Sequence, residues 1–288
     1  MDWFHWILAH LPDKGMLAFA WNDPVIFGSG CLIFFYVCGR IAKVRPGQYF
    51  SRSFAHDLFF WFYYRLGIHT LVFSFWLFKF VGPLLPAWNL MEKWPYWPRL
   101  LVFYLLADFL GYWIHRLRHK VRFLWAFHTM HHSVERMTFA TELRTHPVEM
   151  FIVETLLYIP LFLLGATPHF WGPLALLRSI SEVAQHSELP WRFGPLYYVF
   201  VSPAFHAVHH SVERDHYDRN FGVNLSLWDF LFGTGVDEKE LPKVYGLPDV
   251  KMPDLKSQLF LPFKMIWKSY FPVREHPEVA AGAAASEP

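Results

Sequence analysis

The sequence predicts an all-α, multi-pass membrane protein with about four transmembrane helices and a histidine-rich domain on the cytoplasmic side. Three observations lead to this prediction: an apolar composition, five long apolar stretches, and histidines clustered near the ends of those stretches. Of the 288 residues, 54% are hydrophobic and 20% are aromatic, and the mean hydropathy is positive. This composition argues against an ordinary soluble domain of the same size.

The apolar stretches are candidates for crossing the hydrocarbon core of a bilayer, which takes about 20 residues of helix. The five are residues 24–43, 58–86, 98–117, 147–167 and 169–186. Three prolines and Arg178 interrupt the last two stretches, which are therefore expected either as full spans or as shallow, re-entrant helices. The prolines are Pro160, Pro168 and Pro173.

Positive charges follow the first and third stretches, which puts both of these ends on the cytoplasmic side by the positive-inside rule. The first group is Arg40, Lys43, Arg45 and Arg52, and the second is Arg116, Arg118, Lys120, Arg122, Arg136 and Arg144. The N-terminal segment is acidic and lacks the features of a signal peptide, so we expect it on the outer side, with the first span retained. A bacterial inner membrane and an endoplasmic reticulum membrane both fit this orientation.

No polar linker divides the chain, so we expect one membrane domain with terminal extensions. The expected parts are an N-terminal transmembrane region (1–94), a histidine-rich domain (95–237), a C-terminal segment (238–275) and a disordered tail (276–288). Residues 255–272 mix lysines with aromatic residues and are expected either at the membrane surface or docked on the main domain. Cys31 and Cys38 stand one heptad apart, too far for a disulfide, and are expected as packing residues.

The most informative feature of the chain is an internal repeat that is rich in histidine. Residues 127–136 read FHTMHHSVER and residues 205–214 read FHAVHHSVER, which differ at only two positions. Each repeat holds an HxxHH group, and one HxxxH group precedes both, so eight of the 17 histidines fall into three groups. They are His115 and His119; His128, His131 and His132; and His206, His209 and His210.

These spacings suit metal ligands on helices. Residues three or four apart share one helical face, so histidines within each group can converge on one point. The adjacent pair in each HxxHH is splayed by about a quarter turn, which lets the two neighbours serve different ions. Eight imidazoles also exceed what one first-row ion can use, so the groups predict a di-metal site. Imidazole suits iron, copper, nickel and zinc, and the ligand type alone does not choose among them.

Other functions of histidine fit this pattern less well. A zinc hydrolase would need an HExxH-type motif, which is absent, and would leave most of the grouped histidines without a role. A non-enzymatic haem-binding electron carrier would place paired histidines near the middle of spans, and a metal transporter would line a path at the bilayer midplane. Isolated histidines are expected at membrane surfaces: His5, His10, His56, His69, His169 and His276.

Four motifs carry a family resemblance. They are DFLGYWIHRLRH (108–119), FHTMHHS (127–133), RTHP (144–147) and FHAVHHSVERDHYDRNFG (205–222). They resemble the motifs of the fatty acid hydroxylase and sterol desaturase superfamily of membrane non-haem di-iron enzymes, over about residues 95–237. The resemblance implies two iron ions held by the grouped histidines, dioxygen as co-substrate, and an apolar substrate that is reached from the bilayer.

The resemblance also adds a ninth metal ligand. Members of the family commonly carry a histidine followed by serine between the two HxxHH groups, and His186 in QHSELPW occupies that place. Some members have another histidine four residues earlier, where this sequence has Glu182. We therefore take Glu182 as a candidate catalytic residue that ligates iron or orients His186.

Four further polar residues are candidates for supporting the ligand imidazoles through hydrogen bonds. Asp108 lies two helical turns before His115, where it could bond an imidazole or pair with an arginine. Glu135 and Glu213 occupy the same place in the two repeats, where they could bond ligands or form exposed ion pairs. The fourth candidate is His146, in RTHP.

Asn220, in NFG, is the second candidate catalytic residue. Its amide could approach the metals through water, and a turn before Gly222 is the alternative role. His146 has an alternative as well, because Pro147 after it is well placed in the first turn of a helix.

The expected activity is hydroxylation or desaturation of a lipid from the bilayer. Sterol desaturation, sterol methyl oxidation, fatty-acyl hydroxylation and head-group hydroxylation share the ligand pattern, and the sequence leaves all four open. The chain shows no GxGxxG fingerprint, no cysteine set for an iron–sulfur cluster and no fused haem domain. We therefore expect a separate electron donor, a ferredoxin or a cytochrome b type protein with its reductase, and no nucleic-acid partner.

Overall fold

The computed structural model describes the chain except residues 1–23, 43–48, 87, 89, 167 and 271–288. The described part is helical, without a β-strand beyond one isolated bridge between Ser211 and Tyr245. The expectations for the acidic N-terminus, for Lys43 and Arg45, and for the tail at 276–288 lie outside the described residues. The α-helices are α3 (Pro24–Ile41), α4 (Arg52–Arg65), α5 (Phe75–Phe80), α6 (Tyr96–Lys120), α7 (Arg122–His132), α8 (Pro147–Leu163), α9 (Pro168–Gln185), α10 (Pro203–His209), α11 (Leu227–Leu231) and α12 (Leu255–Tyr270).

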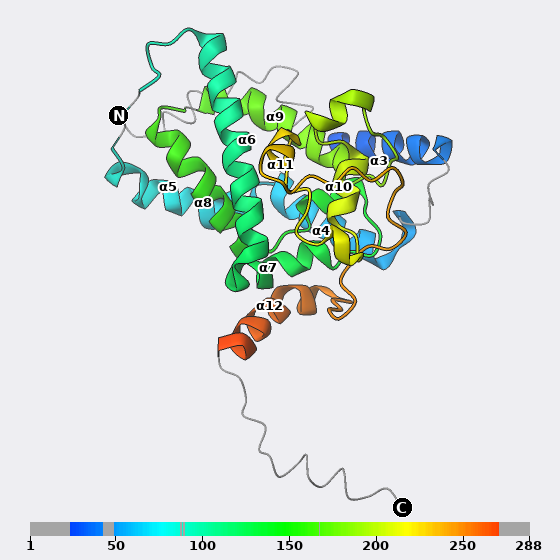
Figure 1. Cartoon of the computed structure of the whole chain (residues 1–288). Helices are drawn as coiled ribbons and strands as arrows, with labels where there is room; N and C mark the ends of the chain where they lie inside the picture. Colours follow the sequence, from blue (N-terminus) through cyan, green and yellow to red (C-terminus); the bar gives the residue numbers. More distant parts are fainter. Residues whose placement is uncertain (1–23, 43–48, 87, 89, 167, 271–288) are drawn as a thin grey trace, which may run out of the picture.

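Helix α6 is the long central element, with α8 beside it and α7 turning off its C-terminal end (Figure 1). Phe103, Ala107 and Ile114 of α6 pack against Leu157 and Leu161 of α8 in a buried apolar cluster. At 25 residues, α6 is the one helix in the described part that is long and apolar enough to cross a membrane. The predicted span at 98–117 is therefore found as a helix.

The other predicted spans appear with different extents. The stretch 58–86 does not form one helix, so its prediction as a continuous span is wrong. Helix α4 ends at Arg65, and Gly67 follows with a φ of 72°, a left-handed conformation that glycine adopts readily. A π-helix (Thr70–Ser74), α5 and a 3-10 turn (Gly82–Leu84) then divide the remainder.

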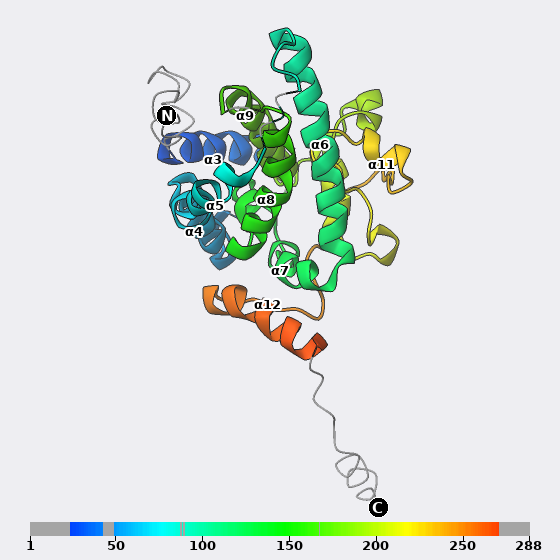
Figure 2. The ribbon, with the colours of Figure 1, turned by 90° about the vertical axis from the view of Figure 1, so that its left-hand side faces the viewer.

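Three helices coincide with the remaining apolar stretches. Helix α3 covers most of 24–43, and its apolar part runs from Phe27 to Ile41, shorter than a full span. Helix α3 runs across the direction of α6 in both views (Figures 1 and 2). Helices α8 and α9 overlap the predicted stretches 147–167 and 169–186, α8 ending at Leu163 and α9 at Gln185, and Pro147 stands in the first turn of α8 as expected. Cys31 and Cys38 on α3 are free thiols, as predicted.

In the segment predicted at 255–272, the described residues 255–270 fold as helix α12, which lies beneath α7 (Figure 2). Gln258 and Pro262 are buried on its inner side, and the ring of Phe263 packs on Phe127 of α7 with the ring centroids 5.3 Å apart. Of the two alternatives for this segment, docking on the main domain describes what the structure shows. Contact with a membrane stays a prediction.

Candidate metal centre

All nine histidines predicted as ligands come together in two adjoining groups of side chains. Within each group the candidate ligand atoms all lie within 4.8 Å of one another. The five-histidine cluster comprises His115, His119, His128, His132 and His209, and the four-histidine cluster comprises His131, His186, His206 and His210. They lie on α6 and α7, directly after α9, and on α10 and the residue after it.

The repeat divides its histidines between the two clusters in a reciprocal way. In the first repeat, His128 and His132 stand four residues apart in the five-histidine cluster, and His131 points into the other cluster. In the second repeat, His206 and His210 belong to the four-histidine cluster, and His209 joins the five-histidine cluster. The splay of adjacent histidines on a helix produces this exchange, as the spacing predicted.

The clusters touch, which makes one centre with two adjacent positions. The imidazole rings of His132 and His210 are stacked with their centroids 4.5 Å apart, and the rings of His128 and His131 are stacked with their centroids 5.3 Å apart. Since His132 belongs to the five-histidine cluster and His210 to the four-histidine cluster, two ions bound there would be neighbours.

The nitrogen atoms of the four-histidine cluster fit a shared ion. The Nε2 atom of His186 lies 3.3 Å from Nε2 of His131 and 3.0 Å from Nε2 of His206, which lies 3.1 Å from Nε2 of His210. Nitrogens bound at about 2.1 Å to one ion stand about 3.0 Å apart in octahedral and about 3.4 Å apart in tetrahedral geometry. The observed separations match the edges of such a coordination shell.

The five-histidine cluster meets a different test. Each of its five Nε2 atoms is buried and has no hydrogen-bond partner among the described residues. Buried polar atoms in native proteins rarely go without a partner, and such a set calls for a ligand. A metal ion bound by these nitrogens accounts for all five.

Hydrogen bonds on the far side of the rings fix how several imidazoles face the centre. The Nδ1 atoms of His115 and His209 donate to the carbonyl oxygens of Phe221 and Arg219 at 2.9 and 2.7 Å. A carbonyl only accepts, so each Nδ1 carries the proton and each Nε2 keeps its lone pair for the centre. His186 is held in the same way by the carbonyl oxygen of Glu182, at 2.7 Å.

Glu149 gives one imidazole a charged partner, and the sequence analysis did not identify it. Its Oε1 lies 2.7 Å from Nδ1 of His128 and accepts from Nη1 of Arg118 at 3.0 Å, and the carboxylate is almost fully buried. A carboxylate behind a ligand imidazole orients the ring and raises its basicity. The missed signal was a glutamate in the apolar helix that follows RTHP, because ionisable residues are rare in such helices.

The environment keeps the ligand histidines neutral. Burial, reinforced by neighbouring positive groups and imidazoles, holds the pKa of His128, His131, His132, His206 and His210 well below the ordinary value. For His209 burial lowers the pKa to about 4. Neutral imidazoles have free lone pairs at neutral pH, which metal binding requires.

A loop after α10 supplies the carbonyl groups that hold His115 and His209. Buried Asp229 accepts hydrogen bonds from the backbone N–H groups of Phe221 and Gly222, at 2.7 and 2.6 Å. Burial raises the pKa of Asp229 to about 6, below neutral pH. A Cβ on Gly222 would come within 2.8 Å of Oδ2 of Asp229, so this close approach requires glycine.

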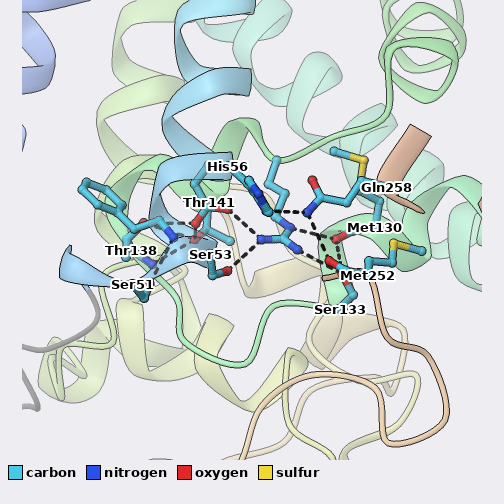
Figure 3. A network of polar contacts seen from close by, with 12 residues as sticks. Ser51, Ser53, His56, Met130, Ser133, Thr138, Thr141, Met252 and Gln258 are labelled. Atoms are coloured by element: carbon cyan, nitrogen blue, oxygen red, sulfur yellow. Dashed lines mark hydrogen bonds and ion pairs between the residues drawn. The ribbon is translucent and has the colours of Figure 1, made fainter. Parts of the chain in front are cut away.

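Arg144 ties the ligand helix α7 to α4. Its Nη1 donates to Oδ1 of Asp57 and to Oγ of Ser53, both at 2.9 Å, and its Nε donates to the carbonyl oxygen of Met130 at 3.3 Å. Figure 3 shows this network around Ser53, Met130 and Ser133. The Met130 carbonyl is in the last turn of α7, where backbone acceptors lack partners within the helix. Arg144 therefore fixes the segment that carries three ligand histidines.

The carboxylates predicted to support ligands have other contacts. Asp108 accepts hydrogen bonds from the backbone of Asn224 and Leu225 and from Nε1 of Trp228, so it anchors a loop instead of bonding an imidazole. Glu135 forms an exposed ion pair with Lys251. The side chain of Glu213 is exposed, and its nearest ionic partner is His216 at 3.9 Å, not a ligand. An exposed ion pair, the alternative for these two glutamates, describes Glu135, whereas the neighbour of Glu213 is a buried histidine.

His146 also has a structural role in place of the predicted contact with a ligand. Its Nδ1 accepts from the backbone N–H of Val148 and so caps α8, while its Nε2 donates to the carbonyl oxygen of Leu259 on α12. The second contact joins α12 to the start of α8. The alternative expectation of a helix start at this position describes what is found.

The two candidate catalytic residues lie near the centre but direct their side chains elsewhere. The Glu182 carboxylate accepts from Nε of Arg178 at 2.8 Å, and only its backbone carbonyl bonds His186. The Asn220 amide donates to the carbonyl of Phe205 and accepts from the N–H of Val236, in a left-handed backbone with a φ of 57°. Both amide ends are thus engaged with backbone, as the turn alternative requires.

The chain was also compared with known proteins. Residues 100–234 match the family model for fatty acid hydroxylase. Over 143 residues the chain is 34% identical to the ornithine lipid hydroxylase OlsE of Rhizobium tropici, which covers 50% of this chain and 43% of the relative. It is 34% identical over 144 residues to human alkylglycerol monooxygenase, and this alignment covers 50% of this chain and 32% of the relative. No solved structure matches.

A further relative is the very-long-chain aldehyde decarbonylase GL1-8 of rice, 29% identical over 186 residues that cover 59% of this chain and 63% of the relative. The chain spans less than half the length of the hydroxylase and monooxygenase relatives. The matched segment at 100–234 contains all the ligand histidines described above. Over this segment the chain is therefore similar to the fatty acid hydroxylase family, in agreement with the superfamily that its histidine motifs resemble.

Proposed function

We propose that this protein is a membrane non-haem di-iron oxygenase that hydroxylates a lipid, using dioxygen and electrons from an external donor. The observation that carries the proposal is the pair of adjoining imidazole clusters, five and four histidines, with their ligand nitrogens buried and aimed at two neighbouring positions. Hydroxylation is favoured over desaturation because the relatives include an ornithine lipid hydroxylase and alkylglycerol monooxygenases. These names make a lipid that carries a polar head group the favoured substrate class.

Iron is the metal we assign to the centre, on the match to the fatty acid hydroxylase family and on the suitability of imidazole for iron. Iron held by these histidines would supply the electrons that activate dioxygen toward an unactivated C–H bond. In the overall reaction the lipid, O₂, two electrons and two protons give the hydroxylated lipid and water. The histidine set contains no electron source of its own, which supports an external donor.

The residues of the chain prepare this chemistry by holding the ligands and excluding water. Backbone carbonyls behind His115, His186 and His209 keep the metal-facing nitrogens unprotonated. The Glu149 carboxylate does the same for His128. The nine imidazoles are almost fully buried, which shields a reactive centre from bulk solvent.

The site is proposed to face the cytoplasm at the C-terminal end of α6. Lys120 ends α6, and Arg116, Arg118 and Arg122 lie close to it in the sequence. By the positive-inside rule this end of a membrane-crossing α6 would be cytoplasmic. His115 and His119 lie on the same part of α6, so the metal centre would be at that surface.

Two measurements test the proposal. Metal analysis of the purified protein should find about two iron ions per chain without haem absorbance, and zinc or haem would contradict it. Lipid profiles of cells with and without the gene should differ by one species that gains an oxygen atom. A species that instead loses two hydrogen atoms would replace hydroxylation by desaturation. The purified protein should be inactive with NADPH alone, and turnover under those conditions would contradict an external donor.

A further inference from the structure

Trp125 of α7 is an aromatic ring that connects the five-histidine cluster with the protein surface. Its ring centroid lies 5.0 Å from that of His119, 5.5 Å from His132 and 6.1 Å from His128. The three imidazoles are almost fully buried, but Trp125 is partly exposed. One aromatic side chain therefore spans the distance from solvent to three metal-ligand rings.

Two neighbouring phenylalanines do not combine these properties. Phe221 contacts the rings of His115, His119 and His209, but it is fully buried. Phe127 contacts His146 and Phe263, and no ring contact between Phe127 and a ligand histidine is present among the described residues. Trp125 thus gives the more direct connection between surface and ligands.

The surface beside Trp125 is positively charged. Its backbone N–H donates to the carbonyl of Val121, at the corner between α6 and α7, where Lys120 and Arg122 are both exposed. Among the described residues, Asp218 is the acidic group paired at this corner: it is engaged with Nζ of Lys120 and lies 3.7 Å from Nδ1 of His119. The guanidinium of Arg122 leaves a net positive surface, which complements an acidic partner.

We propose that Trp125, with Lys120 and Arg122 around it, is the electron-entry site, where an acidic one-electron donor protein with an iron–sulfur or b-type haem centre docks. This inference rests on the proposed function. At each docking event the donor loses one electron and one ferric ion of the centre becomes ferrous, so two events supply the two electrons for one O₂. The indole is neither oxidised nor reduced overall; it provides electronic coupling through its contacts with the ligand rings.

The test compares two routes of reduction in the iron-loaded full-length protein, under anaerobic conditions. In one, reduced [2Fe–2S] ferredoxin or a reduced soluble b-type cytochrome is the reductant; in the other, dithionite with a small viologen mediator is used. Reduction of the iron is followed by stopped-flow absorbance and by electron paramagnetic resonance. Trp125→Leu should slow the protein-driven reduction by an order of magnitude or more, leaving the dithionite rate and the iron content unchanged. In Trp125→Phe, the rate of protein-driven reduction should lie between the rates of the wild-type protein and of Trp125→Leu.

Phe123→Leu is the matched control. Phe123 lies on the same helix, is 37% exposed and packs on Phe127, but within the described part of the chain its ring does not contact a ligand histidine. Arg122→Glu should slow the protein-driven route and flatten its dependence on ionic strength, because docking through opposite charges is screened by salt.

Four outcomes would overturn the proposal. In Trp125→Leu, the first is an unchanged rate of reduction by the donor protein, and the second is a parallel loss of iron or of the dithionite-driven rate. The third is a decrease in the donor-driven rate in Phe123→Leu as large as that in Trp125→Leu. The fourth is a wild-type protein that neither donor protein reduces. The proposed function is checked separately by exposing dithionite-reduced wild-type protein to O₂ and lipid. A hydroxylated product there upholds the lipid oxygenase whatever the result at Trp125.

Discussion

The five-histidine and four-histidine clusters use the same residue type but are held in place differently. In the five-histidine cluster, His115, His128 and His209 each have a hydrogen-bond acceptor behind the ring. In the four-histidine cluster, His186 has one, but the Nδ1 atoms of the other three are buried without a partner in the described structure. Those three histidines are His131, His206 and His210. The two clusters therefore offer the same ligand chemistry but differ in how firmly hydrogen bonds orient the imidazoles. Because fewer of its rings are held in this way, the four-histidine cluster should bind its ion less tightly.

The largest expected difference comes from deleting the first histidine of each repeat. His206→Ala leaves three imidazoles in the four-histidine cluster, whereas His128→Ala leaves four in the other. We expect His206→Ala to lose one of the two ions outright and His128→Ala to retain both with weaker binding. Metal analysis after gel filtration checks this, and equal losses in the two variants would remove the proposed difference.

Breaking the Arg144 network should affect both clusters together. Arg144→Leu leaves Asp57 buried without its ionic partner, and breaking a buried pair in this way costs about 3–5 kcal/mol of stability. Arg144 also holds the last turn of α7, which supplies histidines to both clusters. Both ions should therefore be bound more weakly. Thermal unfolding and metal titration measure the two effects. The paired variant Asp57→Asn with Arg144→Leu is the control, and it should recover part of the stability.

Removing Glu149 should weaken the five-histidine cluster alone. Loss of a carboxylate behind a ligand histidine typically lowers metal affinity about 10–100-fold. Glu149→Gln should have this effect on one ion and spare the other. Glu154→Gln, on the same helix but paired with His69, is the matched control and should leave both affinities unchanged. Competition with a chelator of known affinity gives the values, and a loss at both positions would contradict the assignment of Glu149 to His128.

The smallest effect should appear in the unmodified protein during slow metal removal. Because three rings of the four-histidine cluster lack partners behind them, its ion should leave first, on the order of tenfold faster than the other. Dialysis against a chelator with metal counted over time should show two phases. A single phase would mean that the outer hydrogen bonds do not distinguish the clusters.

Much of the candidate metal site could be predicted from the spacing of histidines within the motifs. The positions of His128, His131 and His132 on one helix follow from HxxHH, and the division of adjacent histidines between the two clusters agrees with the period of the helix. His186 came from family resemblance, since nothing in its own surroundings in the sequence marks it. The contacts of Asp108 and Glu135 could not be predicted, because the partners that engage them lie more than 110 residues away in the chain.

The spans were predicted less well for a similar reason. Hydropathy reports whether a stretch is apolar and does not report whether its backbone stays helical. Gly67 interrupts the stretch 58–86 by adopting a left-handed conformation that hydropathy does not register. Helix α6 has no such interruption and was predicted to within a few residues.

By itself, the sequence determined the helical class, the eight grouped histidines and the splay of adjacent histidines to different sides of a helix, since these depend on composition and on local helical geometry. Only the tertiary structure decided which groups stand behind the ligand rings. The side chains of Glu149, Asp229 and Arg144 form hydrogen bonds with residues on other segments of the chain. A backbone carbonyl such as that of Phe221 has no signature in the sequence. The contacts of Trp125 were likewise visible only in the tertiary structure, because its approach to three imidazoles requires the folded corner between α6 and α7.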